Sequence, residues 1–419
     1  MYQLYDAQNA MMAPLRAFSR IAGATLPHFG YGSESLRGGY ELWARAGLTH
    51  ARPPFGIDSV RIGDAEVAVH EEAVTVTPFA TLLHFKKEQQ TPQPRVLLVA
   101  PLSGHFATLL RGTVRTMLPE HDVYVTDWHN ARDVPVRSGR FGVDEYVEQL
   151  IAFLHTIGPG AHIVAICQPC VTVLAAVAVM AESKDPAQPR SMTLMAGPVD
   201  TRSSPTAVNK LARSKPIEWF ERTLIDRVPW RYRGAGRRVY PGFVQLSAFM
   251  SMNLERHMKA HRDLYAHVAK GEHAEAEAIR AFYDEYFAVL DLDADFYLET
   301  VRLFFQEDAL ARGTLTFRGQ LVRPAAIKHT MLLTVEGEND DICGIGQTLA
   351  AHELCSGLRP HLKRHYLQAG VGHFGVFSGS RWNNQIYPVL RSVIAANDQA
   401  QHAARSRIKE AAAPREHRG

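Results

Sequence analysis

The sequence predicts an α/β fold with a mostly parallel central sheet and a helical insertion. Between residues 96 and 195, short apolar segments with strand character alternate with longer helical segments. This order is typical of a parallel sheet covered by helices on both faces. The alternation stops at about residue 200, and an apolar strand returns at 331–335. The simplest arrangement is one α/β core interrupted by a helical segment.

The first 85 residues differ from the alternating region. Residues 1–55 have helical character, with Gly- or Pro-containing breaks at 30–32 and 53–54. Residues 57–85 show alternating apolar positions and many β-branched side chains. This pattern predicts antiparallel strands at an edge of the sheet.

The alternating region supplies the parallel strands and the helices that cover them. The predicted strands are 96–100, 123–125, 163–166 and 192–195, joined later in the chain by 331–335 and 365–367. The predicted helices are 108–118, 143–157, an Ala-rich segment at 171–181 and a closing helix at 386–395.

We therefore expect four parts. These are an N-terminal helical extension (1–56), an α/β core (57–200 and 331–397), a helical cap or lid (201–330) and a polar C-terminal tail (398–419). The cap segment is helical, irregular and rich in aromatic residues. The tail lacks apolar anchors, so we expect a frayed helix or disorder there.

Composition and charge narrow the range of functions. The chain has 419 residues, is 46% hydrophobic and carries a formal net charge of only +3, which gives no reason to expect nucleic acid or an acidic membrane as partner. Four cysteines are too few for a disulfide framework, and the N-terminus lacks a basic region followed by an apolar core. We expect a cytosolic, reduced protein without an export signal.

One apolar stretch, residues 163–181, is almost long enough to span a bilayer. It contains Gln168 and Pro169 near its start, and the sequence has no second such stretch. A buried parallel strand followed by a buried helix gives the same hydropathy. We therefore expect no integral membrane segment.

Cys167 is the strongest candidate for a catalytic residue. It follows the predicted strand 163–166 and precedes the helical segment that begins after Gln168 and Pro169. A nucleophile on a sharp turn between a buried strand and a helix is the nucleophile elbow of an α/β-hydrolase fold. The N-terminus of the following helix favours a thiolate at this position.

A thiol nucleophile needs a base, and the base needs an acceptor that orients it. In α/β-hydrolases these follow in the order nucleophile, acid, His. Asp340 and Asp341 follow the strand 331–335, and the Gly spacing favours Asp340; His373 lies later, in a Gly-rich apolar loop. His105 is the second candidate for the base, and Asp200 is the second candidate for the acid, although either can serve a local structural role.

The developing oxyanion requires two backbone N–H donors. The amide of Gln168, at the start of the helix after the nucleophile, is one candidate. The loop after strand 96–100 supplies the other, from Leu102 or Ser103. His105 in the same loop is also a candidate for substrate binding.

Other interpretations of the cysteines remain open. Cys167 and Cys170 match C-x-x-C, a redox motif, but this motif accounts for neither Asp340 nor His373. A second pair at zinc-ligand spacing is missing from the sequence, so we expect no metal. Cys170, Cys343 and Cys355 are more typical of packing residues.

Aromatic side chains in the cap are expected to form mostly its own small core. A subset can face an apolar substrate, although spacing does not select its members. The candidates are Trp219, Trp230, Tyr232 and Phe243.

These residues together resemble the intracellular polyhydroxyalkanoate depolymerases, Cys-dependent α/β-hydrolases that mobilise poly-3-hydroxybutyrate storage granules. The resemblance extends from the N-terminal YQL to about residue 395. It depends on APLSGH (100–105), VYVTDW (123–128), CQP (167–169), SPTAVN (204–209), GRRVYPGF (236–243), FYDEY (282–286), VEGENDDI (335–342) and GHFGVFSG (372–379).

The resemblance implies Cys167 as nucleophile, Asp340 as acid and His373 as base, with no cofactor. It implies hydrolysis of short-chain polyester at the surface of cytoplasmic granules through a 3-hydroxyacyl thioester, with a homo-oligomer left open. The alternatives are thiolytic release onto CoA, a polymer synthase, a granule-binding protein without activity and a C-x-x-C oxidoreductase. Synthases carry Gly-x-Cys-x-Gly-Gly at the elbow, whereas this chain has Ala-x-Cys-x-Pro-Cys, which favours the depolymerase.

Overall fold

The computed structural model describes residues 1–25, 33–45, 47–89, 92–252 and 254–398. The predicted break at 30–32 and nearly all of the predicted tail, residues 399–419, lie outside the described residues. Residue 398 is the last described residue of the closing helix.

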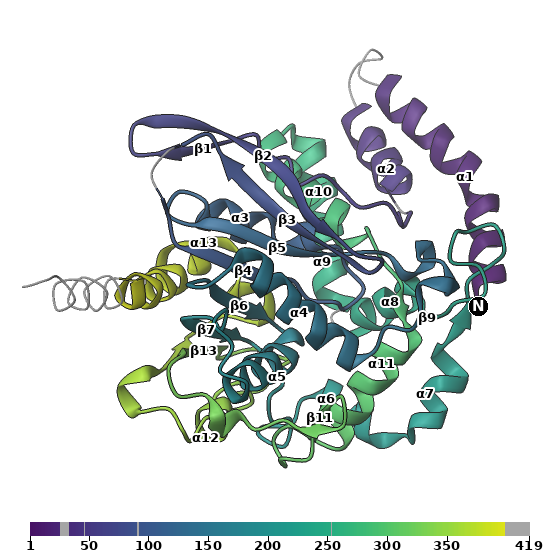
Figure 1. The fold of residues 1–419 in the computed structure, drawn as a ribbon. Coiled ribbons are helices and arrows are strands. Elements are labelled where there is room, and N and C mark those ends of the chain that lie inside the picture. Colours follow the sequence, from purple (N-terminus) through teal and green to yellow (C-terminus); the bar gives the residue numbers. More distant parts are fainter. Residues whose placement is uncertain (26–32, 46, 90–91, 253, 399–419) are drawn as a thin grey trace, which may run out of the picture.

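A nine-stranded sheet forms the centre of the molecule, with the order β1-β2-β3-β5-β4-β6-β7-β13-β14 (Figure 1). Its strands are β1 (Ser59–Ile62), β2 (Ala65–Val76), β3 (Ala80–Lys87), β4 (Arg95–Val99), β5 (Asp122–Trp128), β6 (His162–Ile166), β7 (Ser191–Met195), β13 (Met331–Gly337) and β14 (Lys363–Gln368).

The sheet has an antiparallel edge and a parallel body, in the places where the sequence predicts them. β1, β2 and β3 pair antiparallel, and β3 pairs antiparallel with β5. From β5 to β14 every pair is parallel. β4, β6 and β7 are almost fully buried because helices cover both faces.

The parallel strands are connected by helices. On one face, α4 (Val143–Ile157) and α5 (Pro169–Glu182) lie side by side (Figure 1). On the other face, α3 (Arg111–Met117) lies beside the closing helix, residues 387–398, where the hydroxyl of Tyr387 donates to Glu120 over 2.7 Å. A closed core of apolar side chains results on both sides of the sheet.

A long segment, residues 196–330, separates β7 from β13. Its helices are α6 (Ala207–Ser214), α7 (Ile217–Leu224), α8 (Gly242–Met252), α9 (Leu254–Lys270), α10 (His273–Tyr286) and α11 (Ala294–Thr300), and α11 continues into a π-helix (Val301–Gln306).

This segment is less purely helical than the sequence predicts. A three-stranded antiparallel sheet forms from β8 (Asp226–Arg227), β9 (Arg238–Tyr240) and β10 (Leu292–Asp293), and a short hairpin forms from β11 (Thr316–Phe317) and β12 (Gln320–Leu321). Strands of two or three residues are too short to show a period of two, so the sequence pattern does not reveal them.

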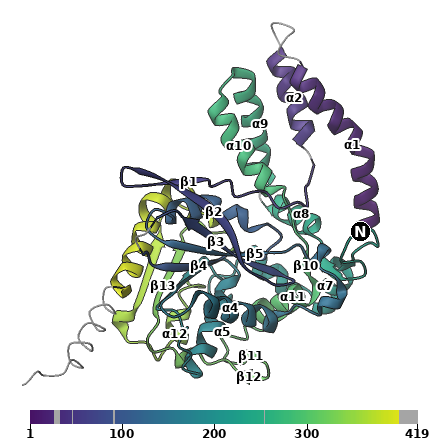
Figure 2. The same ribbon diagram turned by 45° about the horizontal axis from the view of Figure 1, so that its top comes forward.

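The N-terminal helices α1 (Tyr2–Thr25) and α2 (Ser33–Arg45) pack against each other, and α2 packs on α9. Figure 2 shows these helices and α10 rising together from one side of the sheet. The ring of Tyr5 in α1 stacks on Phe243 in α8, with the ring centroids 4.0 Å apart. The start of α1 is thus attached to the segment between β7 and β13.

Among the described residues, no helix has the length and apolar character needed to cross a membrane. Nor does any group of three His, Cys, Asp or Glu side chains in the described ranges lie close enough together to hold a metal ion.

Candidate active site

Cys167 lies in the turn between the end of β6 and the start of α5. Its φ angle is +66°, a left-handed conformation that costs a residue with a Cβ about 1–3 kcal/mol. Backbone hydrogen bonds hold the turn: the N–H of Cys167 donates to the carbonyl of Met195 over 2.8 Å, and the N–H of Cys170 donates to the carbonyl of Cys167 over 3.1 Å. Pro169 begins α5, where a missing N–H leaves no helical bond unmade. The turn therefore has the geometry of a nucleophile elbow.

Cys167 differs from the other three cysteines in its accessibility. All four thiols are free, and Cys167 alone among them is partly exposed. Burial raises the pKa of Cys170 and of Cys343 well above the ordinary value, and raises the pKa of Cys355 to about 12. The buried thiols are therefore held in the neutral form, which is a poor nucleophile.

Cys170 occupies a packed position behind the elbow. Its Sγ lies 3.5 Å from the carbonyl oxygen of Ala165 and 3.6 Å from that of Met195. A Cβ atom at Gly197 would overlap the Cys170 side chain, so only glycine fits there without displacing it. This packing favours a structural role for Cys170.

Asp340 and His373 lie on two different loops at the same edge of the sheet. Asp340 follows β13, and His373 begins the 3-10 helix His373–Val376 after β14. The Nδ1 of His373 donates to the Oδ2 of Asp340 over 2.8 Å. The other oxygen of Asp340 accepts the N–H groups of Ile342 and Cys343, at 2.9 and 2.8 Å. The carboxylate is thereby fixed, and it fixes the imidazole in turn.

The second nitrogen of His373 is left for the thiol. The side chain of Cys167 interacts with that of His373. Burial by itself would lower the pKa of His373, but Cys167 and Asp340 oppose burial and together raise that pKa well above its ordinary value. A His with a raised pKa beside a thiol favours the imidazolium–thiolate pair.

Asp341 does not take the place of Asp340. The side chain of Asp341 is exposed, whereas that of Asp340 is buried against His373. The Gly spacing in the sequence favours the same residue.

The expected oxyanion donors lie on two segments beside the elbow. Gln168 precedes the first residue of α5. The loop with Leu102 and Ser103 follows β4 and is held by the indole N–H of Trp128, which donates to the carbonyl of Ala100 over 2.9 Å. Within the described part of the chain, no hydrogen bond uses the backbone N–H of Leu102, Ser103 or Gln168 as donor.

The second candidates for base and acid are engaged elsewhere. His105 is buried 5.0 Å from Tyr286, measured between ring centroids, and burial lowers the pKa of His105 to about 4. Asp200 forms an ion pair with Arg202 over 2.7 Å. The structure places neither residue in the group formed by Cys167, Asp340 and His373.

The cap aromatics selected from the sequence do not gather at Cys167. Tyr232 and Phe243 pack against Tyr2 of α1. Trp219 packs on Phe220, and Trp230 is 90% exposed. The N-terminal helix partly covers Tyr232 and Phe243, and substrate binding by these four residues stays a prediction.

A different set of aromatic side chains lies beside His373. Phe374 follows it in sequence and contacts Phe282 and Tyr286 of α10, with ring centroids 6.3 and 6.4 Å apart. Phe282 is 39% exposed. The sequence does not show that Phe282, Tyr286 and Phe374 come together, because their position depends on how α10 packs on the core.

Glu336 is a structural residue of the site that the sequence analysis missed. It is buried at the end of β13, and its carboxylate accepts the N–H groups of Gly346 (2.9 Å), Thr348 (2.7 Å) and Leu349 (3.0 Å). The hydroxyl of Thr348 in turn bonds to the backbone of Gly197. Glu336 thus ties the loop after the acid to the backbone beside the elbow.

The fold and this group of side chains define the class of protein. The predominantly parallel sheet carries the nucleophile turn after β6, the acid after β13 and the His after β14, in the chain order of an α/β-hydrolase. Residues 196–398 match the family described as PHB de-polymerase C-terminus. This part of the chain is therefore similar to a PHB depolymerase-type family, and ester hydrolysis is the class of reaction that the match supports.

Comparison with curated proteins finds no match. Solved structures similar to this chain include a carboxylesterase from Nitrososphaera gargenis, 12% identical, covering 82% of this chain and 99% of that chain with a TM-score of 0.41. A 2-hydroxy-6-oxo-6-phenylhexa-2,4-dienoate hydrolase from Rhodococcus sp. strain RHA1 is 10% identical, covering 80% and 99%, with a TM-score of 0.40. An esterase from Thermogutta terrifontis is 14% identical, covering 80% and 98%, with a TM-score of 0.39.

Proposed function

We propose that the protein hydrolyses the ester bonds of amorphous poly(3-hydroxybutyrate) and related short-chain polyesters, with Cys167 as nucleophile. The observation that carries this proposal is that side chains from three separate chain segments lie together. A thiol on a strained elbow interacts with His373, which donates to a buried carboxylate, Asp340, over 2.8 Å. The family match supports the choice of polymer.

The first half of the reaction forms a thioester. His373, oriented by Asp340, takes the proton of Cys167, and the thiolate attacks the carbonyl carbon of an ester. The N–H groups of Gln168 and of Leu102 or Ser103 stabilise the oxyanion. When the tetrahedral intermediate collapses, the carbon–oxygen bond of the ester breaks and the leaving alcohol takes the proton from His373. Asp340 keeps His373 oriented throughout.

The second half returns the free enzyme. His373 takes a proton from water, and the resulting hydroxide attacks the carbonyl carbon of the 3-hydroxyacyl thioester. The carbon–sulfur bond breaks, the 3-hydroxy acid leaves, and the thiolate regains its proton from His373. No cofactor or metal is needed for either half.

The proposed substrate implies where in the cell the enzyme acts. Amorphous polyester of this kind is stored in cytoplasmic granules, so the proposed enzyme works at a granule surface. Residues 201–330 then act as a cap over the catalytic edge of the sheet, between the core parts 57–200 and 331–397.

The experiment compares variants of two neighbouring thiols, Cys167 and Cys170. Native amorphous granules are incubated with wild-type protein, Cys167→Ala and Cys170→Ala, with and without CoA, and released acids are measured. We expect Cys167→Ala to lose at least 10³-fold in rate and Cys170→Ala to remain active. Full activity of Cys167→Ala would rule out the mechanism, and 3-hydroxyacyl-CoA as sole product would make CoA the acceptor instead of water.

A further inference from the structure

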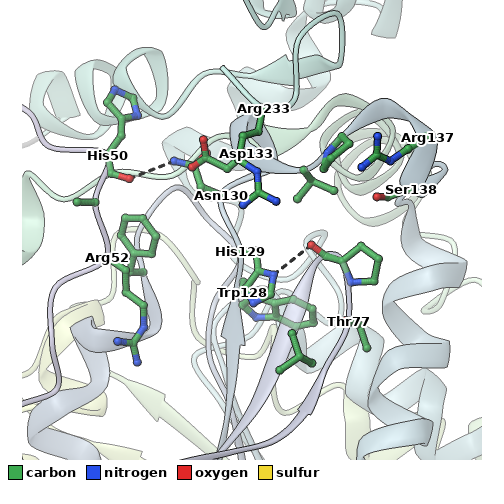
Figure 3. A pocket seen from close by; sticks show the side chains of 16 residues that line it. His50, Arg52, Thr77, Trp128, His129, Asn130, Asp133, Arg137, Ser138 and Arg233 are labelled. Atoms are coloured by element: carbon green, nitrogen blue, oxygen red, sulfur yellow. Dashed lines mark hydrogen bonds between the residues drawn. The ribbon is translucent and has the colours of Figure 1, made fainter. Parts of the chain in front are cut away.

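A cavity lies at the same edge of the sheet as Cys167. It has a volume of about 650 Å³ and is bounded by the turn between β2 and β3, by the chain after β5 and by Arg233. Figure 3 shows the side chains that line it. None of Cys167, Asp340 and His373 is among the lining residues, so this cavity is separate from the candidate catalytic group.

The floor of the cavity is apolar. The ring of Trp128 and that of Phe106 line it, together with Val76 and Val134. Trp128 is fixed by the hydrogen bond from its indole N–H to the carbonyl of Ala100. Apolar walls of this kind suit a short aliphatic chain.

The rim of the cavity is cationic. Arg137 and Arg233 line it and are exposed, and Figure 3 shows both at the side opposite the Trp128 ring. In the described part of the chain, neither arginine forms an ion pair, whereas Arg52 in the same cavity is paired with Asp127 over 2.6 Å. Asp133 is the single acidic residue of the lining.

Two histidines, His50 and His129, also line the cavity. Burial lowers the pKa of His50 to about 3, so this ring is neutral at physiological pH. The ring of His129 is hydrogen-bonded to the hydroxyl of Thr81 over 2.8 Å and to the carbonyl of Pro78 over 3.1 Å. The charges that face a ligand from this rim are therefore those of Arg137, Arg233 and Asp133, with an excess of positive charge.

The cavity lies a short distance from the elbow. Trp128 ends β5, and β5 is separated from β6 by β4 alone. Since neighbouring strands lie about 4.8 Å apart, the ends of β5 and β6 are on the order of 10 Å apart. Phe106 comes directly after the loop that supplies the expected oxyanion donors.

We propose that this cavity binds the carboxylate end of a short aliphatic polyester chain. The inference rests on the proposed function. When the thiolate attacks an ester carbonyl, the alcohol fragment that leaves is the one that carries the free carboxyl end of the chain. A carboxylate held by Arg137 and Arg233 would place an ester bond a few repeat units away at Cys167, with the aliphatic segment on Trp128 and Phe106.

The test compares two substrates that differ in one charge. A short 3-hydroxybutyrate oligomer is supplied as the free acid and as its methyl ester, and kcat/KM is measured for each. We expect wild-type protein to prefer the free acid roughly tenfold, the size of one charge-assisted hydrogen bond at an accessible site. In Arg137→Gln and Arg233→Gln the preference falls, and in the double variant the ratio approaches one.

Arg359→Gln is the matched control, because Arg359 is exposed and lies outside the cavity lining. We expect it to keep the wild-type preference. Equal kcat/KM for acid and methyl ester in wild-type protein would overturn the inference while leaving the proposed hydrolysis intact.

If neither oligomer is cleaved, the proposed function is wrong. The binding of the two oligomers then tests the inference about the cavity separately. Calorimetric titration of Cys167→Ala with the free acid and with the methyl ester gives the two affinities directly. Tighter binding of the acid, lost in the double arginine variant, supports the site. Equal binding, absence of binding, or displacement by inorganic phosphate but not by 3-hydroxybutyrate overturns it.

Discussion

Gly197 lies against Cys170 so closely that a Cβ atom at position 197 would overlap the Cβ and Sγ atoms of Cys170. The same Cβ atom would also lie 3.0 Å from the carbonyl oxygen of Cys167. The backbone after β7 and the first turn of α5 are thus packed without space for one methyl group. The buried thiol belongs to this packing, and the partly exposed thiol of Cys167 does not.

The first prediction follows from this packing. Gly197→Ala should lower the free energy of unfolding by about 1–3 kcal/mol, the range for forcing an extra carbon into a packed core. Gly112→Ala is the control, because it lies in α3 with no atom in the way of its Cβ, and it should be neutral or stabilising by up to about 1 kcal/mol. Denaturant unfolding of both variants gives the comparison.

A second change at position 170 sharpens this prediction. Cys170→Ala keeps the Cβ atom that the new methyl group meets, so it should not rescue Gly197→Ala. Cys170→Gly removes that atom and should recover part of the lost stability. Equal unfolding free energies for Gly197→Ala and Gly112→Ala would contradict the packing argument.

The second prediction concerns the pH dependence of catalysis. Asp340 helps raise the pKa of His373 against the opposing effect of burial, so Asp340→Asn should lower that pKa. The high-pH limb of kcat/KM, which reports loss of the His373 proton from the imidazolium–thiolate pair, should then move to lower pH. The rate itself should fall about 10³–10⁴-fold, because the imidazole loses its orienting acceptor.

Asp341→Asn is the control for this prediction. Asp341 is exposed and adjacent to Asp340 in the sequence. The Asp341→Asn variant therefore tests whether any nearby negative charge is sufficient to raise the pKa of His373. We expect its pH profile to match that of the wild-type protein. Equal displacement of the limb in the two variants would show that Asp340 acts only as one charge among others.

The parallel core could be predicted because its signals are local. β4, β6 and β7 each read as a short apolar segment that ends before a helix, and the structure has strands at these places. The sheet formed by β8, β9 and β10 could not, because it pairs Tyr240 with Leu292 across some fifty residues in strands too short to show alternation.

The candidate site likewise contains residues that could be predicted from the sequence and residues that could not. Cys167 is visible in the sequence as a thiol between a strand and a helix, and Asp340 and His373 follow it in the expected order. The aromatic group of Phe282, Tyr286 and Phe374 is not visible, because it forms only when α10 packs on the core. The stacking of Phe243 on Tyr5 is hidden for the same reason, since it joins α8 to the N-terminal helix.

The last prediction concerns stability and depends on Asp291. This carboxyl is fully buried at the start of β10, and burial raises its pKa to about 7, although the N–H of Gly242 donates to it over 2.9 Å. The facing titratable group is His50, whose Nδ1 lies 3.9 Å away and whose pKa of about 3 keeps it neutral.

The raised pKa of Asp291 determines how its contribution to the unfolding free energy changes with pH. Below pH 3.8 the carboxyl is protonated in both the folded and the unfolded chain, and its contribution to stability is fully present. As the pH rises from 3.8 to about 7, the unfolded chain loses this proton while the folded chain keeps it. The contribution therefore decreases, by an amount on the order of 4 kcal/mol, and levels off above pH 7.

Asp291→Asn isolates this effect, because the amide oxygen still accepts the N–H of Gly242 and the side chain no longer titrates. The unfolding free energy of wild-type protein minus that of the variant should fall steadily from pH 4 to pH 7, while contributions from all other groups cancel. Urea unfolding at closely spaced pH values measures this difference. A difference that stays constant with pH would mean that Asp291 is ionised in the folded protein and that His50 or a solvent molecule compensates its charge.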